Sequence, residues 1–194
     1  MTKRIILGGL LGGVVMFIWG AVSHMVLGLH ESAVKSLPVA AEPAVLTALK
    51  AGVDKPGVYL YPGMEDEKHP TPEQQKQWED KYRAGPAGIL VYQPQGGEFA
   101  MPKRLLKQVG SDIAVALLAA LLLSTASVSL RCYRARSLFV TALGLLPWLA
   151  LSFPYWNWYG FPANFTMVEL LDRLLTFFCG GLVLAGIVKK DESV

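Results

Sequence analysis

The feature that most constrains this chain is the clustering of its apolar residues into long runs. Four runs contain no Asp, Glu, Lys or Arg: 5–29, 113–130, 138–153 and 174–188. A bilayer-crossing helix needs roughly 17–25 mostly apolar residues. The first run is long enough alone, and the second and fourth reach the length with their interfacial ends, the fourth by extension back to Thr166. The third is the shortest and contains Pro147, which predicts a kink. At 53% hydrophobic residues, the composition is also more apolar than that of an ordinary soluble domain, so we expect four transmembrane helices.

The first apolar run has to be distinguished from a secretory signal. Its basic start, MTKR, fits the n-region of a signal peptide, and Ala-Val-Ser before His24 is a weak cleavage candidate. The apolar stretch is longer than the roughly 7–15 residues of a signal h-region. We therefore expect a retained anchor helix.

The basic residues predict the orientation. They cluster before the first run, between the second and third, and after the fourth: Lys3, Arg4, Arg131, Arg134, Arg136, Lys189 and Lys190. An even number of spans places these clusters on one side, and the positive-inside rule makes that side cytoplasmic. Segment 30–108 holds ten basic and ten acidic residues, so the basic excess belongs to topology and requires no nucleic acid. Neither Cys132 nor Cys179 lies in that outer segment, so no disulfide is predicted there.

Segment 30–108 has patterns of its own and predicts a small α/β cap. Residues 43–52 are typical of a short helix with a glycine stop, and 71–85 of a helix with Thr71 as N-cap and proline at its first position. Residues 57–63 and 88–97 are typical of strands. We expect the two strands to pair, with the second helix covering them.

The predicted fold class is an all-α membrane protein with four transmembrane helices and this cap. The predicted parts are helix one at 1–29, the cap at 30–108, helix two at 109–131, the arginine turn with helix three and an outer aromatic loop at 132–165, and helix four with the cytoplasmic tail at 166–194.

Helix one is rich in glycine at helical spacing. Gly8 and Gly12 are four residues apart, as are Gly9 and Gly13. This spacing allows another helix backbone to approach closely within lipid. Glycine is also simply common in membrane helices, so the pattern predicts helix packing without naming the partner.

The aromatic segment 153–166 is predicted to lie at the outer membrane face. Its rings, Trp156 and Trp158 among them, fit an interfacial belt, since Trp and Tyr favour that depth. The alternative is a pocket for a lipid, quinone or pigment.

Ionisable groups near the outer ends of the helices also allow two interpretations. Thr166 and Glu169 match a capping box, Asp172 suits the positive end of a helix dipole, and Glu169 can pair with Arg173 four residues on. Asp112 at the predicted start of helix two suits a dipole in the same way. Alternatively, these groups form a proton or substrate site, because ionisable residues within a membrane often have functions.

His24 lies in the outer part of helix one. A metal site formed from His24, His30, Glu31 or His69 is conceivable, but no H-E-x-x-H or similar spacing supports it. We expect a histidine hydrogen-bonded between helices. Nucleotide-binding glycine motifs and a nucleophile elbow are absent from the sequence, and no cofactor or metal is predicted.

Two motifs carry a family resemblance. FIWGAVSHMVLGLHES followed by GVYLYPGM resembles a group of uncharacterised small bacterial membrane proteins. The shared positions are Trp19, Ser23, Met25, Val26, Leu27, His30, Gly57, Tyr59 and Pro62. The resemblance implies a bacterial cytoplasmic membrane and a retained first helix, and no activity.

The functional expectation is a non-catalytic accessory, assembly or scaffold subunit. It would pack against other integral membrane proteins, possibly of an electron-transfer or transport complex, or against its own copies, with helix one as the docking face and lipids around it. The alternative is a small-molecule or lipid binder, a transporter protomer or a membrane enzyme. Its site would lie at the outer interface and would use His24, Asp112, Trp156, Trp158, Glu169, Asp172 and Arg173.

Overall fold

The computed structural model describes residues 1–194 except 30, 32, 67, 98, 99 and 190–194. The chain forms two compact units. The first comprises Met1–Lys35, Ala100–Trp156 and Phe161–Val194, and the second comprises Ser36–Phe99 with Asn157–Gly160. Most of the second unit therefore comes from the predicted cap.

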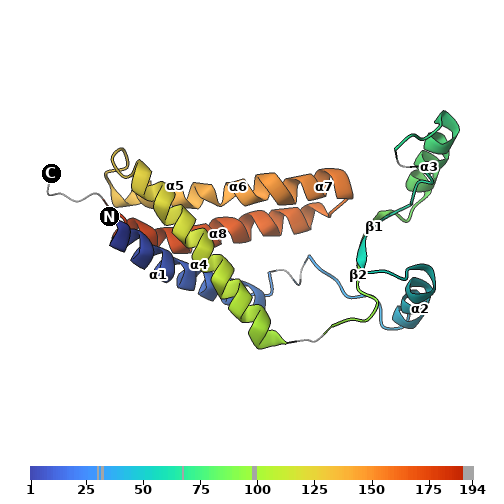
Figure 1. The fold of residues 1–194 in the computed structure, drawn as a ribbon, viewed down its shortest axis with the longest axis horizontal. Helices are drawn as coiled ribbons and strands as arrows, with labels where there is room; N and C mark the ends of the chain where they lie inside the picture. Colours follow the sequence, from blue (N-terminus) through green and yellow to red (C-terminus); the bar gives the residue numbers. More distant parts are fainter. Residues whose placement is uncertain (30, 32, 67, 98–99, 190–194) are drawn as a thin grey trace. The chain divides into compact units, whose positions relative to one another are not determined.

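The first unit is a helical bundle (Figure 1). Within the described residues, four continuous helical stretches are long and apolar enough to cross a membrane. They are α1 (Thr2–Ala21) with a π-helical extension (Val22–Val26), α4 (Met101–Ala126), the chain of α5 (Tyr133–Leu143), α6 (Leu145–Pro147), a second π-helical segment (Trp148–Ser152) and α7 (Phe153–Tyr159), and finally α8 (Ala163–Ile187).

The aromatic segment is helical where a loop was predicted. Residues 153–159 are α7, and only 160–162 separate α7 from α8. Pro154 has no N–H to donate, but the preceding π-helical turn shifts the hydrogen bonds by one residue, so that the Phe153 N–H reaches the Trp148 carbonyl. The helix therefore continues past the proline. It ends at Gly160, whose φ of 70° breaks the helix.

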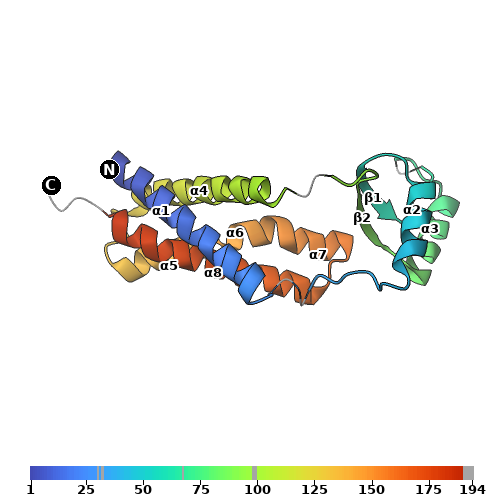
Figure 2. The same ribbon diagram turned by 90° about the horizontal axis from the view of Figure 1, so that it is seen from below.

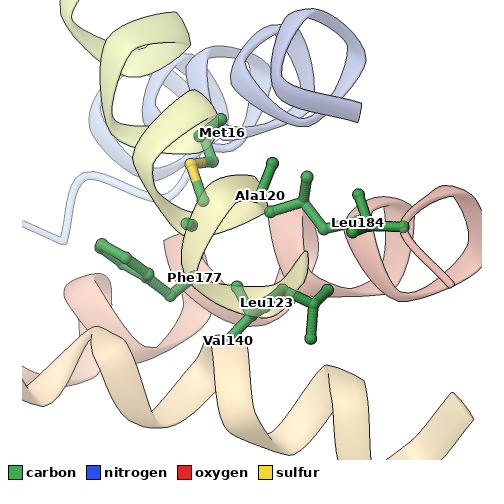
Figure 3. Packing of buried hydrophobic residues seen from close by; sticks show 9 residues of the cluster. Met16, Ala120, Leu123, Val140, Phe177 and Leu184 are labelled. Atoms are coloured by element: carbon green, nitrogen blue, oxygen red, sulfur yellow. The ribbon is translucent and has the colours of Figure 1, made fainter. Parts of the chain in front are cut away.

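The bundle is organised around α1 and α8. Helix α1 packs against α4 and against α8, and α5 packs against α8 (Figure 2). The core between them is formed by side chains from all four stretches, as Figure 3 shows for Met16, Ala120, Leu123, Val140, Phe177 and Leu184. Small residues of α4, including the fully buried Ala116 and Ala120, allow the helices to approach closely.

The glycines of α1 pack inside the chain's own bundle. A Cβ at Gly13 would lie 2.5 Å from the Ile113 Cα, and one at Gly9 would lie 2.9 Å from the Leu117 Cα, so both glycines face α4. Gly8 and Gly12 face Leu184 on α8. All four glycines are buried. The predicted helix packing of these glycines is therefore made within the chain, and α4 and α8 leave no glycine face of α1 open for docking of another protein.

The second unit contains the predicted cap elements. Helices α2 (Glu42–Gly52) and α3 (Pro72–Ala84) accompany two strands, β1 (Gly57–Tyr61) and β2 (Gly88–Tyr92). The strands pair antiparallel with Tyr59 opposite Leu90, which confirms the predicted pairing. The Thr71 side chain caps α3 in a capping box with Gln74. Strand β1 and helix α3 are joined by the Trp78 Nε1–H, which donates to the Pro62 carbonyl at 2.8 Å.

Candidate functional site

The candidate site is centred on a buried carboxylate in the bundle. Asp172 on α8 is 3% exposed. Its Oδ1 accepts two hydrogen bonds from α1, one from the Ser23 hydroxyl at 2.6 Å and one from the Trp19 Nε1–H at 3.0 Å. Charge-assisted hydrogen bonds are stronger than neutral ones, so this contact ties α1 firmly to α8.

The local structure of α1 explains how these donors reach one oxygen. Trp19 and Ser23 are four residues apart and therefore share a helix face. Ser23 lies in the π-helical turn, where the Leu27 N–H bonds to the Val22 carbonyl, and Ser23 itself is fully buried. Such π-turns are frequent at functional positions. The wide turn is thus located where the polar contact is made.

A second carboxylate lies one turn away from Asp172. Glu169 is 9% exposed and pairs with Arg173 at 3.0 Å, as the i,i+4 spacing predicted. Arg173 also acts electrostatically on Asp112 of α4, whose Oδ1 accepts a hydrogen bond from Gln108 at 3.0 Å. Carboxylates from two helices are thus brought into the electrostatic range of one guanidinium.

The predicted helix-end roles of these residues are wrong. Helix α8 begins at Ala163, so Thr166 is not its N-cap, and the Thr166 hydroxyl instead donates to the Pro162 carbonyl. Glu169 and Asp172 consequently lie in the second and third turns, beyond the reach of a capping box or of the strongest dipole effect. Helix α4 begins at Met101, not near 109, so Asp112 is also well inside its helix.

Two buried polar atoms near this centre have no hydrogen-bond partner in the described part of the chain. One is Oδ2 of Asp172, and the other is the hydroxyl of Ser152, which is 6% exposed. Gly144 lies beside the Arg173 carbonyl, and the π-helical segment that contains Ser152 packs against α8. Buried polar atoms are nearly always paired, so these two require an explanation.

The remaining predicted site residues lie apart from this centre. His24 is exposed, and its Nδ1 lies 2.9 Å from the Gly20 carbonyl of its own helix. The Trp156 ring packs on Phe153, with the centroids 5.5 Å apart. Trp158 belongs to the second unit. The described residues contain no group of three or more His, Cys, Asp or Glu side chains suited to a metal, and His30 lies outside them.

Sequence reasoning missed the α1 half of the site. Trp19 and Ser23 were noted only as part of a resemblance. Their i,i+4 spacing was a usable signal, because two hydrogen-bonding side chains on one face of an apolar helix need a partner on a neighbouring helix.

Arg136 was also misjudged by sequence reasoning, which gave it only a topological role. It is 8% exposed, and its Nε donates to the Ala185 carbonyl at 3.0 Å. Its Nη1 donates to the carbonyls of Leu130 and Arg131 at 3.3 and 2.8 Å. A cation near the C-terminal end of α8 also suits the helix dipole, so Arg136 holds this end of the bundle together.

Comparisons with models of protein families, with curated proteins and with solved structures found no match. The resemblance to small bacterial membrane proteins therefore stays a prediction.

Proposed function

We propose that the chain is a multi-pass protein of the bacterial cytoplasmic membrane with both termini in the cytoplasm and the cap outside. The four long apolar helices and the basic residues at one end of the predicted spans support this placement. The exposed surface of the bundle is rich in Leu, Ile, Val and Phe, which suits contact with lipid.

Within the membrane, the protein acts as a non-catalytic accessory or scaffold subunit. The observation that carries this role is an exposed apolar face on the two-stranded sheet of the cap. Val58 and Val91 are cross-strand partners and are 64% and 71% exposed, and Leu60 on the same face is 55% exposed. These residues lie outside the predicted spans, so lipid does not account for them. A two-stranded sheet buries little apolar area of its own, and a covering partner would stabilise it.

The partner is another membrane protein with an outer segment, or a second copy of this chain. Its docking surface is the exposed sheet face formed by Val58, Leu60 and Val91. This surface replaces the glycine face of α1 that the sequence suggested. The bonds from Trp19 and Ser23 to Asp172 support a structural function for the bundle, because they join its helices to one another.

The experiment is purification of the full chain in a gentle detergent, followed by mass analysis of the intact complexes. The double variant Val58→Lys with Val91→Lys is expected to release the partner. Val39→Lys, at a residue that is 85% exposed elsewhere in the same unit, is the matched control and is expected to retain it. A monomer without a co-purifying protein, or equal loss in both variants, would refute the accessory role.

A second candidate function rests on the two unpaired buried atoms. Oδ2 of Asp172 and the hydroxyl of Ser152 could bind a small polar ligand or carry a proton in an uptake or turnover function. Asp172→Asn and Arg173→Ala are expected to abolish such a signal. The double variant Val58→Lys with Val91→Lys is expected to leave it intact. The opposite pattern would favour the accessory role.

A further inference from the structure

The second unit contains a cavity of about 170 Å³ with an unusual lining. Its walls are mostly aromatic side chains and a proline: Tyr61, Pro62, Trp78, Tyr82, Trp158 and Tyr159. All of the residues that line it in the described chain are uncharged. Drug-sized ligands occupy pockets of roughly 300–1,000 Å³, so this one fits a smaller chemical group.

The rings come from three places in the unit. Tyr61 ends β1, and Trp78 and Tyr82 lie one turn apart on α3 with ring centroids 5.3 Å apart. Trp158 and Tyr159 come from the 157–160 segment of the same unit. Three separate segments therefore contribute aromatic side chains to one cavity.

The backbone makes room for one of these rings. An ideal Cβ at Gly88 would lie 2.6 Å from the Tyr61 hydroxyl and 2.9 Å from its ring. The Trp78 indole is fixed by its hydrogen bond to the Pro62 carbonyl. Trp78 is therefore held in place before any ligand arrives, which lowers the entropic cost of binding.

The rings that line the cavity are accessible to a ligand. Trp158 is 77% exposed, and Tyr82 and Tyr61 are 50% and 43% exposed. Trp is highly buried on average, so a largely exposed indole at the wall of an aromatic cavity is uncommon. The ring faces carry negative electrostatic potential and attract cations.

We propose that this cavity binds a trimethylammonium group, as found in a choline lipid headgroup or in a free choline-type solute. A primary ammonium is less suitable, because its three N–H donors need acceptors and no carboxylate lines the cavity. A methylated ammonium needs only aromatic faces around it, and recognition of quaternary ammonium groups by aromatic cages works in this way.

The test is titration of the full chain in detergent with choline and with tetramethylammonium, followed by tryptophan fluorescence. The neutral isostere 3,3-dimethylbutan-1-ol controls for apolar fit. Saturable binding of both cations is expected, at least tenfold tighter than binding of the isostere, since a desolvated cation–π contact contributes about 2 kcal/mol. Equal binding of choline and the isostere would overturn the proposal, as would an absence of saturable binding.

Variants locate the site. Trp158→Leu is expected to weaken choline binding about tenfold, and because its indole is so exposed the change should leave the fold intact. Tyr82→Phe keeps the ring and is expected to bind normally. Trp156→Leu, two residues away and outside the cavity, is the matched control. Equal losses at positions 156 and 158, or no loss at 158, would contradict the site.

The lipid and solute sources are separated in nanodiscs. If the headgroup is the natural occupant, discs of phosphatidylcholine are expected to shift the choline titration to higher concentration relative to discs of phosphatidylglycerol. If a free solute is the occupant, the two titrations will coincide. This outcome does not depend on whether the exposed sheet face at Val58 and Val91 binds a partner.

Discussion

Asp172 depends on its hydrogen-bond partners more than any other single residue in the bundle. A carboxylate that is 3% exposed loses its hydration, and among the described residues the hydroxyl of Ser23 and the indole of Trp19 replace it. A hydrogen bond to a charged group contributes about 1.5–3 kcal/mol. These two contacts thus make Asp172 a determinant of how α1 and α8 pack.

Substitution of Asp172 tests this role. Asp172→Asn keeps an oxygen acceptor and is expected to cost little stability. Asp172→Ala leaves the donors of Ser23 and Trp19 unpaired and is expected to lower the free energy of unfolding by about 2–3 kcal/mol. Chemical unfolding in mixed micelles measures both, with Glu79→Gln on the surface of α3 as the control. Equal stability of the two Asp172 variants would rule out the hydrogen-bond explanation.

At this scale the sequence predicted only what is local. The Glu169–Arg173 pair follows from i,i+4 spacing, and the structure contains it. The capping box at Thr166 failed because nothing local revealed that Pro162 would precede the helix start. The contact between Trp19 and Asp172 joins residues 153 positions apart, and no local pattern encodes such a pairing.

Helix packing in the bundle depends on where small residues meet neighbouring backbones. Gly13 and Gly20 provide a comparison on one helical stretch, because a Cβ at Gly13 would collide with Ile113 whereas one at Gly20 would meet nothing within 4 Å. The glycine pattern therefore matters only where another helix crosses it.

We expect Gly13→Ala to push α1 away from α4 and to destabilise the bundle by about 1–3 kcal/mol, the usual cost of overpacking. Gly20→Ala is expected to be neutral or slightly stabilising, because alanine favours the helix. Thermal unfolding of the two variants in the same detergent is the measurement. A Gly20→Ala variant as unstable as Gly13→Ala would indicate a propensity effect and not a packing effect.

Arg136 offers a test at the other end of the bundle. Arg136→Met removes the donors to three carbonyls and is expected to cost about 3 kcal/mol of stability, whereas Arg134→Met, at an exposed position of the same helix, should change little. If both arginines only set the orientation in the membrane, the two Met variants would have equal free energies of unfolding. Chemical unfolding measures this difference.

The elements were predicted better than their ends. Helix α4 begins before the predicted 109, because Lys103 and Arg104 are compatible with helix but interrupt an apolar run. The 153–159 segment is predicted to be part of a loop, because Pro154 and the clustered aromatic residues are typical of one. The π-helical turn that keeps it helical leaves no mark in the apolar periodicity.

At the scale of the whole molecule, the lengths of the apolar runs and the turn residues were sufficient to predict the order and type of the elements. Four long helices and a two-stranded sheet were predicted, and the described chain has both. The partner of the α1 glycines was not predictable, since the same spacing serves contact within a chain or between chains. The aromatic cavity was also not predictable, because its rings come from segments far apart in the sequence.

The proposed placement of the cap outside and of the arginine turn inside is tested most directly by labelling in intact cells. Native Cys132 is exposed in the turn between α4 and α5, and Lys76→Cys adds a thiol on the exposed surface of α3. A membrane-impermeant maleimide is expected to label position 76 in intact cells and Cys132 only after permeabilisation. Labelling of Cys132 in intact cells, or protection of position 76 until the membrane is opened, would contradict the arrangement.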